Sequence, residues 1–358
     1  MSQTPINPEA NYHFASDNSA GIAPEAWAAL SDANIGDAPS YGADPWTQHA
    51  KQLICEIFER DCEVYFVSTG TAANSLSLAH LCRSYQSILC HKFSHLDTDE
   101  CNGPEFFTGG SKIIPLPGPN GKLSPTGLAD ILRRDGGVHF PKPGVLSLTQ
   151  ATEWGTLYTP AEIGVLSDLA KQFSIPIQMD GARFANAAAA LGETGVTPAD
   201  ITWKAGVDVL TLGGTKNGLS GSEAVVFFKK EMALDFEYRL KQAGQCASKQ
   251  RFFTAQWCGM LEGGAWLRHA RYANLKARDL AERLSGLQNI RLITDTEANS
   301  VFVEMSQGAA QKLTALGWRF LPFLTENGFR FMCSWDTRED EMERLIKDVS
   351  SVSQTNNT

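Results

Sequence analysis

The chain has 358 residues, of which 43% are hydrophobic and 20% charged, as is usual for a globular protein with a large core and more than one domain. Its formal charge of −9 argues against nucleic acid or an anionic membrane as the main partner, because both are bound by basic surfaces. No run approaches the roughly 20 apolar residues of a membrane-spanning helix, the first residues lack the pattern of a secretory signal, and the eight cysteines contain no CxxC pair. We therefore expect a cytoplasmic protein with reduced thiols and no bound metal.

Short β-rich runs alternate with helical patterns through the first two thirds of the chain. Strands are predicted at 63–67, 144–150, 175–180, 207–212 and 223–228. Helices are predicted at 68–82 and at 159–173, where Ile163, Leu166, Leu169 and Phe173 recur at helical spacing. This alternation predicts an α/β fold with a mostly parallel sheet and helices on its faces.

The pattern changes after about residue 231. Long amphipathic helices are predicted at 231–242 and 265–284, followed by strands at 301–305 and 330–335 and a helix at 339–349. We expect a frayed end at 352–358. The expected domains are an N-terminal segment at 1–20 near the active site, a large domain at 21–245 and a small α+β domain at 246–358.

Two predicted turns carry groups suited to bind charge at the carboxyl ends of strands, where open α/β sheets bind ligands. "STGTAAN" (68–74) opens a helix, and its free N–H groups and hydroxyls predict a phosphate site, although many strand-to-helix turns look alike. "QMDGAR" (178–183) places Asp180 at the end of a buried strand, where a carboxylate requires a partner. That partner can be a ligand, the nearby Arg183, or the start of the next helix.

Two further segments complete the pattern. "TLGGTKNGLSG" (211–221) surrounds Lys216 with small residues, which predicts that this lysine approaches something flat and bulky, although a solvated turn lysine is the alternative. "CHKFSHLDTDE" (90–100) gathers histidines and acids, but it lacks the HxxxH helix context of a metal site. A phosphate cup, a buried carboxylate, a stacking ring and a lysine together are the parts that hold pyridoxal phosphate.

The order of these motifs resembles the fold-type I pyridoxal phosphate enzymes, and closely the threonine aldolases of the aromatic amino acid β-eliminating lyase group. The resemblance runs nearly end to end, and its low-specificity L-threonine aldolase branch, also called phenylserine aldolases, is the most similar. Its motifs are "FASDNSAGIAPEAW" (14–27), "YGADPWT" (41–47), "STGTAAN", "SHLDTDE" (94–100), "MDGAR" (179–183), "GGTKNG" (213–218), "KQAGQCASKQRF" (241–252) and "FRFMCSWDT" (329–337). The resemblance implies a seven-stranded, mostly parallel sheet in a large pyridoxal-phosphate-binding domain, with a smaller α+β C-terminal domain.

The resemblance also implies three sets of site residues. The catalytic set is Lys216, His95, Asp180, Glu100, Glu153 and Asp99. The cofactor-binding set is Lys216, Gly70, Thr71, His95, Asp180, Arg183, Thr215, Lys241 and Lys249. The substrate-binding set is Ser16, Arg183 and Arg330, where the guanidinium groups suit a carboxylate.

Each role is implied by position in the family's motifs. Lys216 would hold the cofactor covalently, Asp180 would bind its ring nitrogen, and His95 would stack on the ring with Glu100 orienting it. The phosphate would lie at Gly70 and Thr71, with help from Thr215 and from Lys241 or Lys249 of a neighbouring subunit.

One position departs from part of the family. Many threonine aldolases have a histidine after the strand at 144–150, and here "ATEWG" places Glu153 there. This leaves open which group takes the proton of the β-hydroxyl. Asp97, Asp99 and Glu153 are candidates beside His95, and each can instead be a solvated loop carboxylate.

The implied activity is that of a carbon–carbon lyase. It would cleave L-threonine, L-allo-threonine and related β-hydroxy-α-amino acids such as phenylserine to glycine and an aldehyde. A β-eliminating lyase, an aminotransferase and an inactive cofactor-binding domain are the alternatives. The family also implies a homo-oligomer, a dimer of dimers, with a small amino acid as its substrate and neither nucleic acid nor membrane as a partner.

Overall fold

The computed structural model describes residues 11–134, 136–323 and 325–353, and its contacts divide the chain into two units. The larger unit runs from Ile22 to Arg268, and the smaller unit combines the N-terminal residues up to Gly21 with the chain from His269 onward. No helix in the described part of the chain has both the length and the apolar character needed to cross a membrane.

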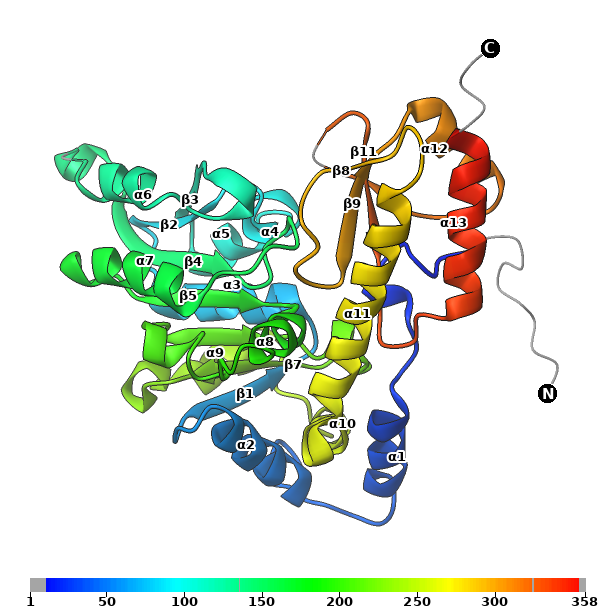
Figure 1. Cartoon of the computed structure of the whole chain (residues 1–358). Helices are drawn as coiled ribbons and strands as arrows, with labels where there is room; N and C mark the ends of the chain where they lie inside the picture. The colour runs from blue at the N-terminus through cyan, green and yellow to red at the C-terminus, as the bar shows by residue number, and fades with distance from the viewer. Residues whose placement is uncertain (1–10, 135, 324, 354–358) are drawn as a thin grey trace. The chain divides into compact units, whose positions relative to one another are not determined.

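The larger unit is built around a seven-stranded sheet (Figure 1). Its strands are β1 (Glu63–Val67), β2 (Gln86–His91), β3 (Lys112–Leu116), β4 (Lys142–Thr149), β5 (Ile177–Gly181), β6 (Val209–Leu212) and β7 (Glu223–Phe227). Their order across the sheet is β1-β7-β6-β5-β4-β2-β3, and β7 runs opposite in direction to the other six strands. The predicted seven-stranded, mostly parallel sheet is confirmed.

The helices of the larger unit lie before, between and after the strands along the chain. They are α1 (Pro24–Ala33), α2 (Pro45–Ile57), α3 (Gly70–Leu81), α4 (His95–Thr98), α5 (Gly103–Thr108), α6 (Pro125–Leu132), α7 (Pro160–Gln172), α8 (Phe184–Gly192), α9 (Phe236–Gln242) and α10 (Arg251–Leu261). Short 3₁₀ turns lie at Pro119–Gly121, Gly137–His139, Trp203–Ala205, Thr215–Asn217, Lys230–Ala233 and Glu262–Gly264.

Helices cover both faces of the sheet. Val67 of β1 packs in a cluster with Leu76 of α3 and Phe236 of α9, whereas the ring of its neighbour Phe66 lies 6.2 Å from that of Trp257 in α10. Successive strand residues point to opposite faces, so α3 and α10 lie on opposite sides. Every residue of β5, β6 and β7 is buried, as expected for strands covered on both faces.

Local sequence signals set the ends of α7. Thr159 and Glu162 form a capping box at its start, with Pro160 in the first turn. The buried face is Ile163, Leu166, Ser167 and Ala170. The predicted apolar row is therefore correct at its first two positions, but Phe173 is the C-cap and is 38% exposed, because the helix ends at Gln172.

The smaller unit has a four-stranded antiparallel sheet of order β10-β11-β9-β8. Its elements are a 3₁₀ turn (Asp17–Ser19), α11 (Ala265–Ser285), whose first residues belong to the larger unit, β8 (Arg291–Leu292), β9 (Ser300–Glu304), α12 (Gln307–Ala315), β10 (Leu321–Pro322), β11 (Gly328–Met332) and α13 (Glu339–Ser353). Helices α11, α12 and α13 share one core with β9 and β11 (Figure 1). The predicted small α+β domain is confirmed in kind.

The N-terminal segment belongs to this second core. Phe14 is fully buried in it, with its ring 6.0 Å from that of Trp318. The backbone of Asn11 forms an isolated β-bridge with that of Trp318. The expected frayed end at 352–358 is wrong for its first two residues, because Val352 and Ser353 belong to α13 and are buried. Residues 1–10 and 354–358 lie outside the described residues.

The boundary between the two units lies at Arg268, whereas the domains expected from the sequence were 21–245 and 246–358. Residues 246–268 fall in the larger unit because α10 packs on α1, with Ala255 buried against Ala29 and Ala33.

Candidate active site

The sheet brings most of the predicted site residues of the larger unit to the carboxyl ends of its parallel strands. Strands β2, β4, β5 and β6 are parallel neighbours, and β1 runs in the same direction because two antiparallel pairings relate it to β6. The segments after β1, β2, β4 and β6 carry Gly70, His95, Glu153 and Lys216, and Asp180 lies in β5 itself, just before its end at Gly181. The carboxyl ends of the strands therefore gather these residues, as expected for a ligand site in an α/β sheet.

Lys216 lies in the 3₁₀ turn that follows β6. The two glycines before it are required by backbone packing. A Cβ on Gly213 would lie 2.4 Å from the carbonyl oxygen of Ala182, and one on Gly214 would lie 2.4 Å from that of Ser222. These two glycines therefore let the turn lie against neighbouring backbone. That the small residues also let Lys216 approach something flat and bulky stays a prediction.

Glu223, which sequence reasoning missed, supports the same turn. It is the first residue of β7, and its Oε2 accepts a hydrogen bond of 2.6 Å from the N–H of Gly214. Burial raises the pKa of this carboxyl, opposed by hydrogen bonds from the turn and by the positive charge of Lys216. An acid at the head of the otherwise apolar run "EAVVFF" was the available signal.

Asp180 follows Met179 in β5 and is 3% exposed. Its Oδ1 accepts from the N–H of Ala182 at 3.0 Å, and its Oδ2 accepts from Nδ2 of Asn74 at 2.9 Å. The first bond closes the turn that precedes α8. The alternative that Asp180 caps the start of this helix is wrong, because Arg183 occupies the N-cap position of α8. The carboxylate is thus held by neutral donors and keeps lone pairs for a further donor.

His95 and Glu100 form a hydrogen-bonded pair. Nδ1 of His95 lies 2.9 Å from Oε1 of Glu100, whose side chain has no exposed area, whereas the imidazole is one third exposed. The hydrogen bond to Glu100 raises the pKa of His95, with further contributions from Asp180 and Glu153. Burial raises the pKa of Glu100. The predicted orientation of His95 by Glu100 agrees with this geometry.

Asn74 joins the two acids, and sequence reasoning missed it as well. Its Nδ2 donates to Oδ2 of Asp180 and to Oε1 of Glu100, both at 2.9 Å. Asn74 is part of the motif "STGTAAN", but a polar residue in a helix indicates such a role only when it is known to be buried.

The candidate acids for the β-hydroxyl differ in exposure. Asp97 and Asp99 are exposed, and Asp99 is the C-cap of α4. Glu153 is partly buried, and its charge is one of those that raise the pKa of His95. Of the three carboxylates, Glu153 therefore has the clearest electrostatic link to His95.

The predicted phosphate site lies at the start of α3. The helix begins at Gly70, and Oγ1 of the N-cap Thr69 accepts from the N–H of Ala72 at 3.1 Å. A Cβ on Gly70 would meet no atom within 4 Å, so the space above this glycine is open. Thr215 lies in the turn with Lys216, where its side chain is one of the groups that lower the pKa of Glu223.

The segment that carries the expected cation approaches the same strand end from within the chain. Oε1 of Gln245 accepts from both the N–H and the hydroxyl of Ser68 at 2.9 Å. Nζ of Lys241 lies 4.9 Å from the centre of the Tyr41 ring. Lys249 is exposed. Whether either lysine serves a neighbouring subunit stays a prediction.

Ser16 and Arg330 lie in the smaller unit, unlike the other predicted site residues. Oγ of Ser16 caps the 3₁₀ turn by accepting from the N–H of Asn18 at 3.2 Å. Arg330 is on β11, is 8% exposed, and has its guanidinium 5.7 Å from the ring centre of Phe323. Its role in binding a substrate carboxylate stays a prediction.

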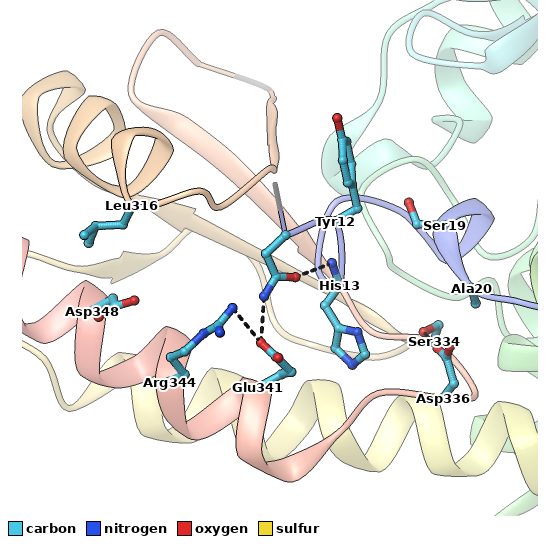
Figure 2. A pocket seen from close by; sticks show the side chains of 11 residues that line it. Tyr12, His13, Ser19, Ala20, Leu316, Ser334, Asp336, Glu341, Arg344 and Asp348 are labelled. Atoms are coloured by element: carbon cyan, nitrogen blue, oxygen red, sulfur yellow. Dashed lines mark hydrogen bonds and ion pairs between the residues drawn. The ribbon is translucent and has the colours of Figure 1, made fainter. Parts of the chain in front are cut away.

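A pocket of about 630 Å³ in the smaller unit lies elsewhere (Figure 2). Asn11 donates to Glu341 there, and Arg344 pairs with the same acid. None of the predicted site residues lines this pocket. Within residues 11–134, 136–323 and 325–353, no three His, Cys, Asp or Glu side chains gather as a metal site would require. In the segment 90–100, which raised the metal alternative, His91 lies 3.2 Å from the carbonyl oxygen of Gly118.

The fold, with Lys216 and Asp180 at the carboxyl ends of β6 and β5, places the chain in the class of fold-type I enzymes. The chain belongs to the beta-eliminating lyase family, which matches residues 13–307. It is 50% identical over 339 residues to the low specificity L-threonine aldolase of Pseudomonas aeruginosa, covering 95% of this chain and 97% of that protein, and 49% identical over the same shares to that of a Pseudomonas species. The solved structure of Leishmania major threonine aldolase superposes with a TM-score of 0.89 at 25% identity, covering 96% of this chain and all of that one. The predicted family and fold class are confirmed.

Proposed function

We propose that the protein is a pyridoxal-phosphate-dependent aldolase that cleaves L-threonine, L-allo-threonine and related β-hydroxy-α-amino acids to glycine and an aldehyde. Phenylserine is included among the substrates. The observation that carries the proposal is the placement of Lys216 and Asp180 at the ends of the adjacent parallel strands β6 and β5, with the His95–Glu100 pair linked to Asp180 through one amide. The high identity to low specificity L-threonine aldolases over almost the whole chain supports the reaction type.

The residues present fit pyridoxal phosphate. The space above Gly70 at the start of α3 is open, as a phosphate cradle requires. Asp180 accepts one hydrogen bond at each oxygen and can accept another from a protonated ring nitrogen. When bound, the cofactor supplies an aldehyde that links covalently to an amine and a ring that withdraws electrons from the bond to be cleaved.

The chain's own groups then have distinct tasks. Lys216 supplies the amine, and Asp180 keeps a proton on the ring nitrogen because its negative charge favours the cationic ring. Arg183 and Arg330 bind the substrate carboxylate, which fixes the substrate's orientation. His95, with its pKa raised by Glu100, exchanges a proton at the β-hydroxyl, and Glu153 is the second candidate for that proton.

The same proposal extends to location and assembly. All eight cysteines are free thiols, as in a reducing cytoplasm. The dimer of dimers, with Lys241 or Lys249 of one subunit reaching the phosphate of another, rests on the family resemblance.

The test is a product analysis with a lysine variant. Protein loaded with pyridoxal phosphate is incubated with L-threonine, and acetaldehyde, glycine and pyruvate are measured separately. We expect equal amounts of acetaldehyde and glycine. Release of pyruvate and ammonia would instead identify a β-eliminating lyase, and a requirement for an α-keto acid would identify an aminotransferase.

Lys216→Ala is expected to lose both turnover and the visible absorbance band of the covalently held cofactor. Lys112→Ala, at an exposed lysine at the start of β3, is the matched control and is expected to keep both. An unchanged band in Lys216→Ala would contradict the assignment of the lysine.

A further inference from the structure

Asn74 occupies an unusual position in α3. It is 2% exposed, and every residue from Ala73 to Ala79 is buried. An amide in such a place is costly unless all its hydrogen-bonding groups are satisfied, because each unpaired buried group loses its hydration without replacement.

The amide of Asn74 is fully satisfied. Its nitrogen donates to Oε1 of Glu100 and to Oδ2 of Asp180, both at 2.9 Å. Its oxygen accepts from Oγ1 of Thr211 at 2.8 Å and from Nε2 of Gln178 at 3.1 Å. These four bonds use both donors and both lone pairs of the side chain.

The two carboxylates fix which way the amide points, because an ionised carboxylate only accepts hydrogen bonds. The amino group of Asn74 therefore faces Glu100 and Asp180, and its oxygen faces Thr211 on β6 and Gln178 on β5. Oε1 of Gln178 in turn accepts from Oγ of Ser147 on β4 at 2.6 Å. A flipped Asn74 would point its oxygen at two carboxylates and its N–H groups at the amino group of Gln178, so one orientation is strongly favoured.

The two acids interact through this amide. Both carboxylate oxygens lie 2.9 Å from a single nitrogen, so two buried acids stand close together. Burial and the charge of Asp180 raise the pKa of Glu100, whereas hydrogen bonds from His95 and Asn74 lower it. The charges that face His95 are Glu100, Asp180 and Glu153, and all three raise its pKa.

We propose that Asn74 is a positioning residue, which donates one N–H to Asp180 and the other to Glu100 so that both remain ionised and correctly placed. Asp180 can then hold a proton on the cofactor ring while Glu100 holds a proton on His95. This inference rests on the proposed function. The four hydrogen bonds of the Asn74 amide go to Glu100, Asp180, Thr211 and Gln178, which leaves none for His95. Asn74 therefore acts only through the two acids.

A purely structural role is the alternative, since the same bonds also tie α3 to β5 and β6. The two differ in what removal of the amide does to titration. When the N–H groups of Asn74 are removed, the pKa of Glu100 rises and Glu100 takes up a proton at a higher pH. His95 then loses the negative charge that raised its pKa. A mere tether would lower stability and leave the titration of His95 unchanged.

The experiment compares Asn74→Ala with Ser75→Ala. Ser75 is the next residue of the same helix, is fully buried, and its hydroxyl has no partner among the described residues, so it controls for a small change in the same core. Thr211→Val keeps Asn74 but removes one donor to its oxygen, and serves if Asn74→Ala does not fold. The pKa of His95 is measured by NMR titration of the protein without cofactor, with His95→Gln to assign the signal.

We expect the pKa of His95 to fall in Asn74→Ala, to fall less in Thr211→Val, and to stay at the wild-type value in Ser75→Ala. In the loaded protein, kcat of Asn74→Ala is expected to fall roughly ten- to hundredfold, the loss of hydrogen bonds to two charged groups, with a smaller change in KM. The pH at which the visible band of the cofactor changes is also expected to move in Asn74→Ala.

The outcomes separate the inference from the proposed function. If the wild-type protein cleaves threonine but Asn74→Ala keeps the wild-type titration of His95 and of the visible band, the inference is wrong and the function stands. If wild-type protein neither binds pyridoxal phosphate nor cleaves threonine, the proposed function fails, even where the titration of His95 still depends on Asn74.

Discussion

Replacing Gly213 by alanine tests whether packing of the backbone places Lys216. The new Cβ would lie 2.4, 2.7 and 2.8 Å from the O, C and Cα atoms of Ala182, all of them backbone, so no flexible side chain can move aside. Overpacking of this kind costs about 1–3 kcal/mol. For a unit of this size, that corresponds to a fall in melting temperature of roughly 2–12 °C.

Gly70→Ala is the matched control, because its Cβ would meet nothing within 4 Å and its backbone is not in the left-handed region. In the first turn of α3 an alanine is expected to leave the stability unchanged or to raise it by up to about 1 kcal/mol. Its methyl group nevertheless enters the space proposed for the phosphate. We therefore expect the Kd for pyridoxal phosphate to rise roughly five- to hundredfold, equivalent to a steric cost of about 1–3 kcal/mol.

The assay is differential scanning calorimetry of both variants without cofactor, followed by fluorescence titration with pyridoxal phosphate. Gly213→Ala should lose stability, and Gly70→Ala should lose cofactor affinity alone. Equal melting temperatures for the two variants would refute the packing argument for the Lys216 turn. Unchanged cofactor affinity in Gly70→Ala would refute the assignment of the phosphate cradle.

Two further predictions concern other parts of the chain. Hydrogen bonds from Cys62, whose sulfur lies 3.1 Å from that of Cys55, lower the pKa of Cys55, so iodoacetamide should label Cys55 at a lower pH than an ordinary thiol, and Cys62→Ala should move the labelling midpoint upward. Mass spectrometry of the peptide across pH measures this, and a midpoint left unchanged in Cys62→Ala would show that Cys62 does not stabilise the thiolate. Phe14→Ala should destabilise the smaller unit by about 3–5 kcal/mol, because Phe14 is fully buried in its core; calorimetry or limited proteolysis measures this, and a wild-type melting profile would exclude Phe14 from the core.

The sequence predicted what depends on local pattern and motif order. Strand ends are local, and the parallel sheet gathers them at one edge, so Lys216, Asp180 and the His95–Glu100 pair are found where a ligand would bind. The limits of helix α7 were less accurate, because its apolar spacing continues to Phe173 although the helix ends one residue earlier.

The supporting residues were missed because their partners are far away in the chain. Asn74 meets Asp180, 106 residues later, and Thr211, 137 residues later, and no periodicity records such contacts. The packing role of Gly213 and Gly214 was missed for the same reason, because the backbone that they approach belongs to other segments.

The smaller unit is assembled from both ends of the chain, with the whole larger unit between them. During synthesis Phe14 leaves the ribosome long before Trp318, its neighbour in the finished core. The first apolar residues of this unit therefore have no core to pack in until about 300 further residues have been added. The larger unit, whose contacts end at Arg268, can complete itself in that interval. The order of translation therefore separates the two units in time, and the last helices to emerge close the core that the first residues began.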